Sequence, residues 1–307
     1  MADSASPDGP LTGTRILSLA LNLPGPAAVM RCRAMGADCT KLEPPSAGGA
    51  DPMGRYAPRA YDEMHHGIRK IVADLKTEAG QAVLHGELAG CDVLVTSFRP
   101  SALGKLKLEW AGLSARYPRL SMVTIVGSPG ALAEAPGHDL TYMAENDLLQ
   151  GTALPPTLFA DMAGSLMVSE AVLQALLRRM ATGKGSAVEV SLSSAASYLA
   201  LPRKWGLTQP AGAVGGAHAG YNVYRCQDGR VAVAALEPHF AARLLRAAGI
   251  DAMADAAAMH DPAVAAAVAG FMARQGCAQL DAWAAAHDVP LHTLPDGAES
   301  AATVLRS

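Results

Sequence analysis

The sequence predicts an α/β protein that has a Rossmann-like larger domain and a smaller α+β domain at its C-terminal end. Two observations carry this prediction. Half of the 307 residues are hydrophobic and only 5% are aromatic, a mixture that suits helices packed on a buried sheet. Short apolar runs also alternate along the chain with longer segments typical of helices, and this alternation favours an open sheet of parallel strands.

The first strand, helix and second strand of the larger domain follow one another closely. Residues 15–19 form a short apolar run typical of a buried strand, and residues 22–26, which contain two prolines, are predicted to break it. A helix is predicted over 27–35, closed by Gly36, and a second strand over 39–42. This order predicts parallel pairing of the two strands.

The same pattern recurs further along the chain. Strands are predicted at 71–73, 93–95 and 121–126, and a helix at 77–89. The Pro- and Gly-rich residues 44–54 are predicted to form a loop. Open sheets bind ligands at the carboxyl ends of their strands, so the polar residues that follow strands are the candidates for function.

A change of composition separates the two predicted domains. The larger, CoA-binding domain is placed at 11–208, a Gly- and Ala-rich linker at 209–220 and the smaller domain at 221–307. An AspGly pair between two apolar runs predicts a hairpin in the smaller domain. Its strands are expected at 221–226 and 231–235 around a turn at 227–230, and helices at about 239–248, 262–274 and 278–287.

Charge and cysteine content limit the partners and the compartment. The net charge of −3 gives no reason to expect nucleic acid or an anionic membrane as a partner. The longest apolar stretch, Met162 to Met180, is interrupted by Ser, Glu and Arg, so no uninterrupted run of ~18 apolar residues predicts a membrane span. The five cysteines form no CxxC pair, and no signal-peptide pattern opens the chain. These features predict a soluble cytoplasmic protein with reduced thiols.

Several motifs that would indicate other chemistries are missing from the sequence. There is no GxxxxGK[ST] phosphate-binding loop, no GxGxxG after the first strand, no GxSxG and no HExxH or Cys/His cluster. No metal site is therefore expected.

Three polar residues remain as candidates for catalysis, each with a structural alternative. Asp161 lies just before a long predicted helix and could equally serve as a helix cap. His138 follows a loop, where a histidine is more often structural than catalytic. Glu237 could simply open the next helix, because acidic residues are favoured in a first turn.

Basic residues close to predicted strand ends could bind phosphate groups. Most such charges are simply solvated on a protein surface. These residues are Lys41, Lys76, Arg99 and Lys105, together with Arg69 and Lys70.

Five segments, in order and at consistent spacing, resemble the family III CoA-transferases (CaiB/BaiF), the group that includes α-methylacyl-CoA racemase. They are LTGTRILSL followed by PGP, MGADCTKLEPP (35–45), GIRKIVADLK (67–76), SFRPSALGKLKL (97–108) and GHDLTY (137–142). The last segment is similar to the racemase branch in particular. The resemblance implies an interlocked homodimer in which both chains build each active site.

The resemblance also implies roles for individual residues. In the racemase branch, the matching His138 and Asp161 act as acid/base groups, and the matching Glu237 pairs with the histidine. Coenzyme A is implied as part of the acyl-CoA substrate, and no tightly bound cofactor is implied. The implied CoA contacts are Ala73, Asp74, Leu75, Lys76, Ser97, Phe98, Arg99, Lys105, Gly137, Asp139 and Tyr142.

Three functions follow from this resemblance. The leading hypothesis is racemase-like α-proton transfer on an acyl-CoA. The second is CoA transfer between carboxylic acids through a covalent intermediate on Asp161. The third is a catalytically silent acyl-CoA-binding homologue, because Pro44 stands where the racemase pattern often has a CoA-contacting arginine and the C-terminal return to the larger domain is expected to be shortened.

Overall fold

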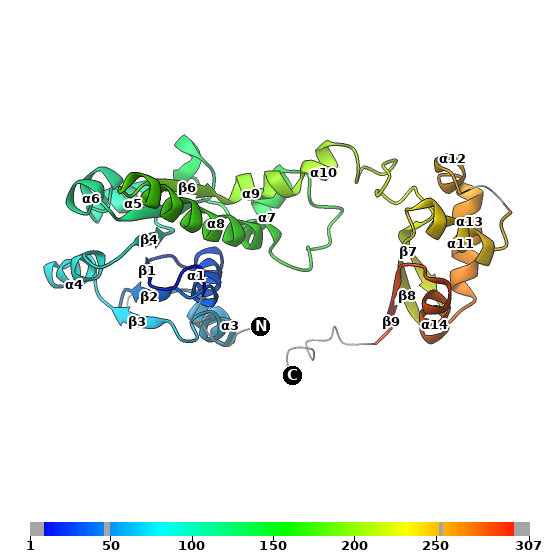
Figure 1. Cartoon of the computed structure of the whole chain (residues 1–307), viewed down its shortest axis with the longest axis horizontal. Helices are drawn as coiled ribbons and strands as arrows, with labels where there is room; N and C mark the ends of the chain where they lie inside the picture. The colour runs from blue at the N-terminus through cyan, green and yellow to red at the C-terminus, as the bar shows by residue number, and fades with distance from the viewer. Residues whose placement is uncertain (1–8, 46–49, 252–253, 298–307) are drawn as a thin grey trace. The chain divides into compact units, whose positions relative to one another are not determined.

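Two compact units make up the chain in the computed structural model, which describes residues 9–45, 50–251 and 254–297 (Figure 1). Contacts within the chain divide it between Ala200 and Leu201, ahead of the predicted end of the larger domain at position 208. Each unit has its own hydrophobic core.

A parallel six-stranded sheet forms the centre of the first unit, as the sequence predicts. Its strand order is β3-β2-β1-β4-β5-β6, and every neighbouring pair is parallel. This is the strand order of a Rossmann-like, doubly wound fold. The strands are β1 (Arg15–Ser18), β2 (Asp38–Glu43), β3 (Arg69–Val72), β4 (Val93–Thr96), β5 (Ser121–Val126) and β6 (Ala187–Ser191).

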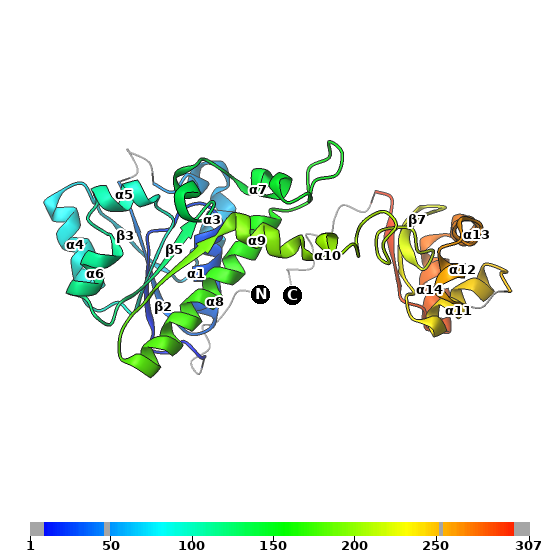
Figure 2. The same cartoon turned by 90° about the horizontal axis from the view of Figure 1, so that it is seen from above.

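Helices cover both faces of this sheet (Figure 2). One face is packed by α1 (Pro24–Ala34) and α8 (Phe159–Thr182), and the other by α4 (Glu78–Leu88), α5 (Pro100–Lys105) and α6 (Trp110–Arg116). Because both faces are covered, the apolar side chains of β4 from Val93 to Val95 are fully buried, as expected for a central parallel strand.

Two predictions about the first hundred residues are wrong. Helix α1 begins at Pro24 and not at Ala27, because the prolines lie in the first turn, where their missing N–H groups cost nothing. The predicted loop at 44–54 gives way at its end to helix α2 (Met53–Tyr56), which α3 (Pro58–Met64) follows. Residues 46–49 of that loop lie outside the described residues.

Helix α8 is long and apolar enough to cross a membrane by length and composition, with a mean hydropathy of 1.2. The sequence pattern did not predict this. Half of the most apolar part of the helix is buried inside the structure, however, and the helix packs on α1, β5 and β6. Its apolar character therefore has an explanation as a core helix.

The remaining elements of the first unit stand near the carboxyl ends of the strands. They are a short 3₁₀ helix (Gly130–Glu134), α7 (Asp139–Glu145) and α9 (Leu192–Leu199). Helix α7 packs on both α8 and α9.

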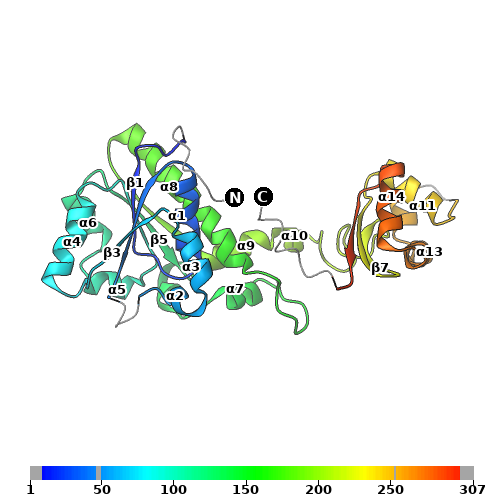
Figure 3. The same cartoon turned by 90° about the horizontal axis from the view of Figure 1, so that it is seen from below.

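The second unit is an antiparallel three-stranded sheet with helices packed on it (Figure 3). Strands β7 (Tyr221–Cys226) and β8 (Gly229–Ala234) form the predicted hairpin, and β9 (Leu291–Pro295) adds the third strand. The turn is tighter than predicted and includes only Gln227 and Asp228. Gly229 is required beside β9, since a Cβ there would lie 2.3 Å from the carbonyl oxygen of Leu294.

Five helices complete the second unit. They are α10 (Leu201–Lys204), α11 (Pro238–Ala247), α12 (Ala256–Met259), α13 (Pro262–Ala273) and α14 (Cys277–His287), of which α11, α13 and α14 match the predicted positions to within a residue or two. The predicted linker at 209–220 runs as bends and turns without a helix or strand.

Candidate active site

A pocket of about 260 Å³ lies at the carboxyl ends of β1 and β4, where the strand order reverses. Leu21 and Asn22, which follow β1, line it together with Ser97 and Arg99, which follow β4. This switch point is where doubly wound sheets bind their ligands. Ser97 and Arg99, two of the predicted CoA contacts, thus line the pocket at this switch point.

His138 and Asp161 line the same pocket, although they are 23 positions apart in the sequence. His138 precedes the first turn of α7, and its N–H donates to Oγ1 of Thr141 at 3.1 Å while the Thr141 hydroxyl donates back to the His138 carbonyl at 2.8 Å. Asp161 lies in the first turn of α8. The fold thus brings an imidazole and a carboxyl group, each held by the start of a helix, to one cavity.

Burial and, to a smaller extent, the nearby carboxylate of Asp139 together raise the pKa of Asp161 to about 6. The positive end of helix α8 favours an ionised carboxylate, but here burial and the like charge outweigh it. A carboxyl group with such a pKa is present in both protonation states near neutral pH, as an acid/base catalyst requires.

Asp139, and not Asp161, is the carboxylate that caps the start of α8. Its Oδ1 accepts the N–H of Asp161 at 3.0 Å, while the residue itself is only 3% exposed. The alternative reading of Asp161 as a helix cap is therefore wrong. The capped N–H is also no longer available to stabilise a developing oxyanion.

Tyr142 closes one side of the pocket between two glycines. A Cβ on Gly127 would lie 2.3 Å from the Tyr142 hydroxyl oxygen, and one on Gly137 would lie 2.6 Å from it. Burial raises the pKa of Tyr142, and the charge of Asp161 adds to the effect. The neutral phenol therefore forms part of the wall beside Asp161, and both glycines are needed to admit it.

Sequence reasoning missed the support behind Asn22. Asn22 adopts a left-handed backbone conformation (φ 61°), and its N–H donates to Oδ1 of Asp51 at 3.0 Å. The other oxygen of Asp51 pairs with Nζ of Lys41 at 2.9 Å. Both charged groups are nearly inaccessible, at 2% and 1% exposure. A lysine inside the apolar strand of residues 39–42 was the one signal in the sequence that could have indicated such a pair.

Lys41 cannot contact a phosphate group in this arrangement. The sequence offered Lys41 either as a phosphate contact or as a solvated surface charge. Both readings are wrong, because its ammonium group is buried against Asp51, Glu43 and the carbonyl of Ala20. Its role is to hold the loop before α2 against the ends of β1 and β2.

A second pocket, of about 810 Å³, lies beside α4 and α5. The predicted contacts Leu75, Lys76 and Lys105 line it, and Lys107 and Arg116 add two more cations. Helix α5 connects the two pockets, since Arg99 precedes its first residue and Lys105 ends it.

Of the other predicted contacts, Gly137 and Tyr142 line the first pocket, whereas Ala73, Asp74, Phe98 and Asp139 line neither. Ala73 and Phe98 pack in the core under α4 to α6, and Oδ1 of Asp74 accepts the N–H of Lys76 at 3.0 Å. Glu237 belongs to the second unit, where it is the exposed residue that precedes α11. Its pairing with His138 stays a prediction.

Two groups of potential metal ligands occur among the described residues, although the sequence motifs gave no reason to expect one. In the group Glu43, Asp51 and His65, the ammonium group of Lys41 already provides the positive charge between the two carboxylates. The other group lies in the second unit and consists of Cys226, Asp228 and Cys277.

The sequence is similar to one family of known enzymes. The family model for CoA-transferase family III matches residues 11–302. The human α-methylacyl-CoA racemase is 29% identical over 258 residues, which are 78% of this chain and 65% of the racemase. The acetyl-CoA:oxalate CoA-transferase of Acetobacter aceti is 29% identical over 204 residues, 61% of this chain and 52% of that enzyme. The chain thus spans roughly half to two thirds of these relatives.

Solved structures share the fold. A hypothetical protein from Mycobacterium tuberculosis superposes with a TM-score of 0.78 at 22% identity, covering 92% of this chain and 84% of that one. A CAIB/BAIF family protein from Brucella suis gives 0.75 at 24% identity, covering 92% and 83%.

Proposed function

Because the chain belongs to CoA-transferase family III, we propose that it catalyses racemase-like transfer of the α-proton of an acyl-CoA thioester. One observation carries this proposal: His138 and Asp161 line a single pocket from the starts of two different helices. Racemisation needs one group to remove the proton and a second group to return a proton to the opposite face of the carbon.

The proposed chemistry divides between these two side chains. Asp161, with its pKa near 6, removes the α-proton in one direction and returns a proton in the other. His138 performs the complementary step, and Glu237 of a second copy of the chain is proposed to orient it. The charge that develops on the thioester oxygen requires hydrogen-bond donors at this pocket. The N–H of Asp161 is not one of them, because Asp139 accepts it.

Coenzyme A is proposed as part of the substrate and not as a tightly bound cofactor. The four cations of the second pocket, Lys76, Lys105, Lys107 and Arg116, suit the phosphate groups of the nucleotide end. Helix α5 leads from one pocket to the other, with a rise of about 9 Å from Arg99 to Lys105 at 1.5 Å per residue. Ser97 and Arg99 are proposed to contact the part of the substrate next to the thioester.

CoA transfer between carboxylic acids is the second candidate. It is favoured by the CoA-transferases among the relatives, which include the acetyl-CoA:oxalate and cinnamoyl-CoA:phenyllactate enzymes. In that reaction ionised Asp161 attacks the thioester carbonyl carbon, the C–S bond breaks, CoA leaves as a thiolate and a mixed anhydride forms on Asp161.

We also propose a cytoplasmic homodimer with no nucleic-acid or membrane partner. Large apolar side chains are exposed on α8 and α9, with Leu177 at 64% and Tyr198 at 68%, and a second copy would cover them. Light scattering should then give twice the chain mass of 31.6 kDa, and a single-chain mass would contradict the dimer.

Deuterium incorporation distinguishes the candidate reactions. In deuterated water and without an acceptor acid, the racemase-like enzyme should place deuterium at Cα of a 2-methylacyl-CoA. Trapping of an acyl group on Asp161 by hydroxylamine, without deuterium at Cα, would instead establish transfer. If neither deuterium incorporation nor trapping occurs with any of a panel of acyl-CoAs that bind, the protein is a catalytically silent homologue.

A further inference from the structure

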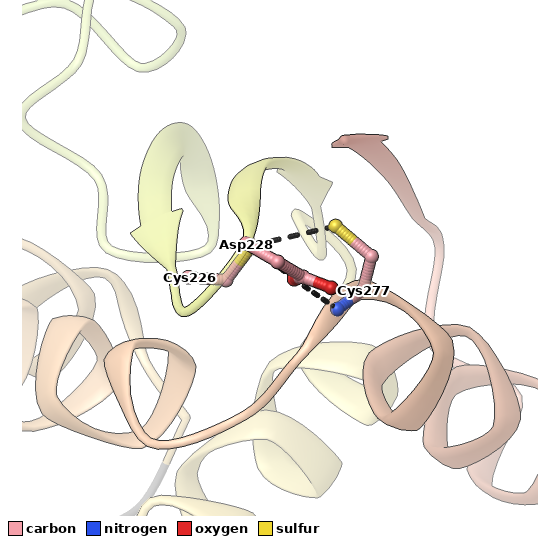
Figure 4. Close-up of side chains that lie close together, drawn as sticks. All are labelled: Cys226, Asp228 and Cys277. Atoms are coloured by element: carbon pink, nitrogen blue, oxygen red, sulfur yellow. Dashed lines mark hydrogen bonds between the residues drawn. The ribbon is translucent and has the colours of Figure 1, made fainter. Parts of the chain in front are cut away.

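Two thiols of the second unit lie side by side, although the sequence separates them by 51 residues. Cys226 ends strand β7 and Cys277 begins helix α14, and their sulfur atoms are 3.6 Å apart (Figure 4). Neither cysteine lines the pocket at β1 and β4, and neither has a role in the chemistry proposed there.

The spacing of the two sulfurs fits a shared metal ion. Each sulfur of a tetrahedral zinc site lies about 2.3 Å from the ion. Two sulfurs at 3.6 Å would then subtend an angle of about 103° at the ion, close to the tetrahedral value. The two ligands can therefore take up an ion without moving apart.

A carboxylate supplies a third ligand at the same place. Asp228, in the turn between β7 and β8, has Oδ1 3.9 Å from the sulfur of Cys226 and accepts the N–H of Cys277 there at 2.7 Å. Its other oxygen remains for an ion, and the ligand atoms of the three residues lie within 4.8 Å of one another.

We propose that Cys226, Asp228 and Cys277 bind one zinc-like divalent ion, with a water molecule as the fourth ligand. The donor set of two thiolates and one carboxylate selects zinc, cadmium or cobalt over magnesium or calcium. Each thiol releases its proton to solvent when the ion binds. Asp228 is exposed and Cys226 partly so, which gives the ion an entry path.

The backbone around the three residues is already fixed in position. The N–H of Gln227 donates to the carbonyl of Gln275 at 2.9 Å, and the N–H of Asp296 donates to the carbonyl of Asp228 at 2.8 Å. The side-chain amide of Gln227 also donates to the carbonyl of Arg274 at 3.1 Å. The bound ion therefore connects the β7–β8 turn to the start of α14 and stabilises the second unit.

Cobalt titration tests this site on the full-length chain, reduced and freed of metal with a chelator under anaerobic conditions. Cobalt should produce a cobalt–thiolate charge-transfer band that saturates at one ion per chain and disappears when zinc displaces it. Cys226→Ser and Cys277→Ser should each abolish the band. Cys91→Ser is the matched control, because Cys91 is a partly buried thiol of the first unit.

Asp228→Asn keeps an oxygen that can accept the N–H of Cys277, so this variant should fold while its cobalt affinity falls about tenfold or more. Zinc should also raise the thermal midpoint of the wild-type chain but not that of Cys226→Ser. The proposal is overturned if the chain with all five thiols reduced binds no cobalt, if the band survives in either cysteine variant, or if the thiols form only a disulfide.

Discussion

The N–H of Asp161 donates a hydrogen bond of 3.0 Å to Oδ1 of Asp139, which connects the start of α8 to that of α7. The same contact places a second, buried carboxylate beside Asp161 and contributes to the raised pKa of that residue. Asp139 thus both positions Asp161 and adjusts its acidity.

Replacing Asp139 by Asn should lower the pH at which Asp161 ionises. The amide oxygen can still accept the N–H of Asp161, but the like charge is gone. In the direction that needs Asp161 as the base, proton exchange should rise through about pH 6 in the wild type and at lower pH in the variant. The pH profile of kcat/KM measures this shift, and an unchanged or higher inflection would rule out the role of Asp139.

Asp161→Asn should stabilise the folded chain at high pH. The pKa of Asp161 is about 6 in the folded protein and about 3.9 in the unfolded chain. The folded state therefore holds a proton that the unfolded state has already released, and stability falls as pH rises between these values. The penalty is complete above about pH 6 and absent below about 3.9.

The variant lacks this penalty, so its free energy of unfolding should exceed that of the wild type by up to about 3 kcal/mol at pH 8, with no gain at pH 3.5. Urea unfolding at the two pH values provides the measurement. Asp62→Asn, at an exposed position of α3, serves as the control. An equal effect of Asp161→Asn at both pH values would contradict the raised pKa.

Lys41→Met should destabilise the protein by about 3–5 kcal/mol, because it leaves the buried charge of Asp51 without its partner. Adding Asp51→Asn should restore part of this loss, since Asn can still accept the N–H groups of Asn22 and Met53. Denaturant unfolding of the single and double variants gives the coupling energy. Additive losses would show that the ion pair does not act as a unit.

Lys76→Gln and Lys105→Gln should each raise KM for an acyl-CoA about tenfold while kcat stays unchanged, because a charged contact far from the thioester binds substrate and transition state equally. Lys184→Gln, an exposed residue outside both pockets, is the control. An acyl-pantetheine without the nucleotide should show no difference between variants and wild type. A fall in kcat with constant KM would argue against phosphate binding there.

Local sequence patterns predicted the parallel sheet because buried strands of this fold are short apolar runs between turn residues. The strand at 121–126 was predicted to the residue. The patterns did not predict the ion pair of Lys41 and Asp51 or the approach of Cys226 to Cys277. Each contact joins two segments of one unit that are distant in the sequence, and such a contact leaves no periodic signal. Asp139 was predicted only as a CoA contact, since its hydrogen bond to Asp161 depends on how α7 meets α8.

The central claim is that His138 and Asp161 act on opposite faces of one carbon. Each enantiomer of a 2-methylacyl-CoA, incubated separately in deuterated water, should give a deuterated product enantiomer while the recovered substrate keeps its proton at early times. His138→Ala should slow proton removal from one enantiomer by on the order of 10²–10⁴-fold. Exchange at Cα of the other enantiomer should remain, because Asp161 removes that proton. Equal loss of exchange from both enantiomers in this variant, or deuterium appearing equally in recovered substrate and product, would contradict the two-base assignment.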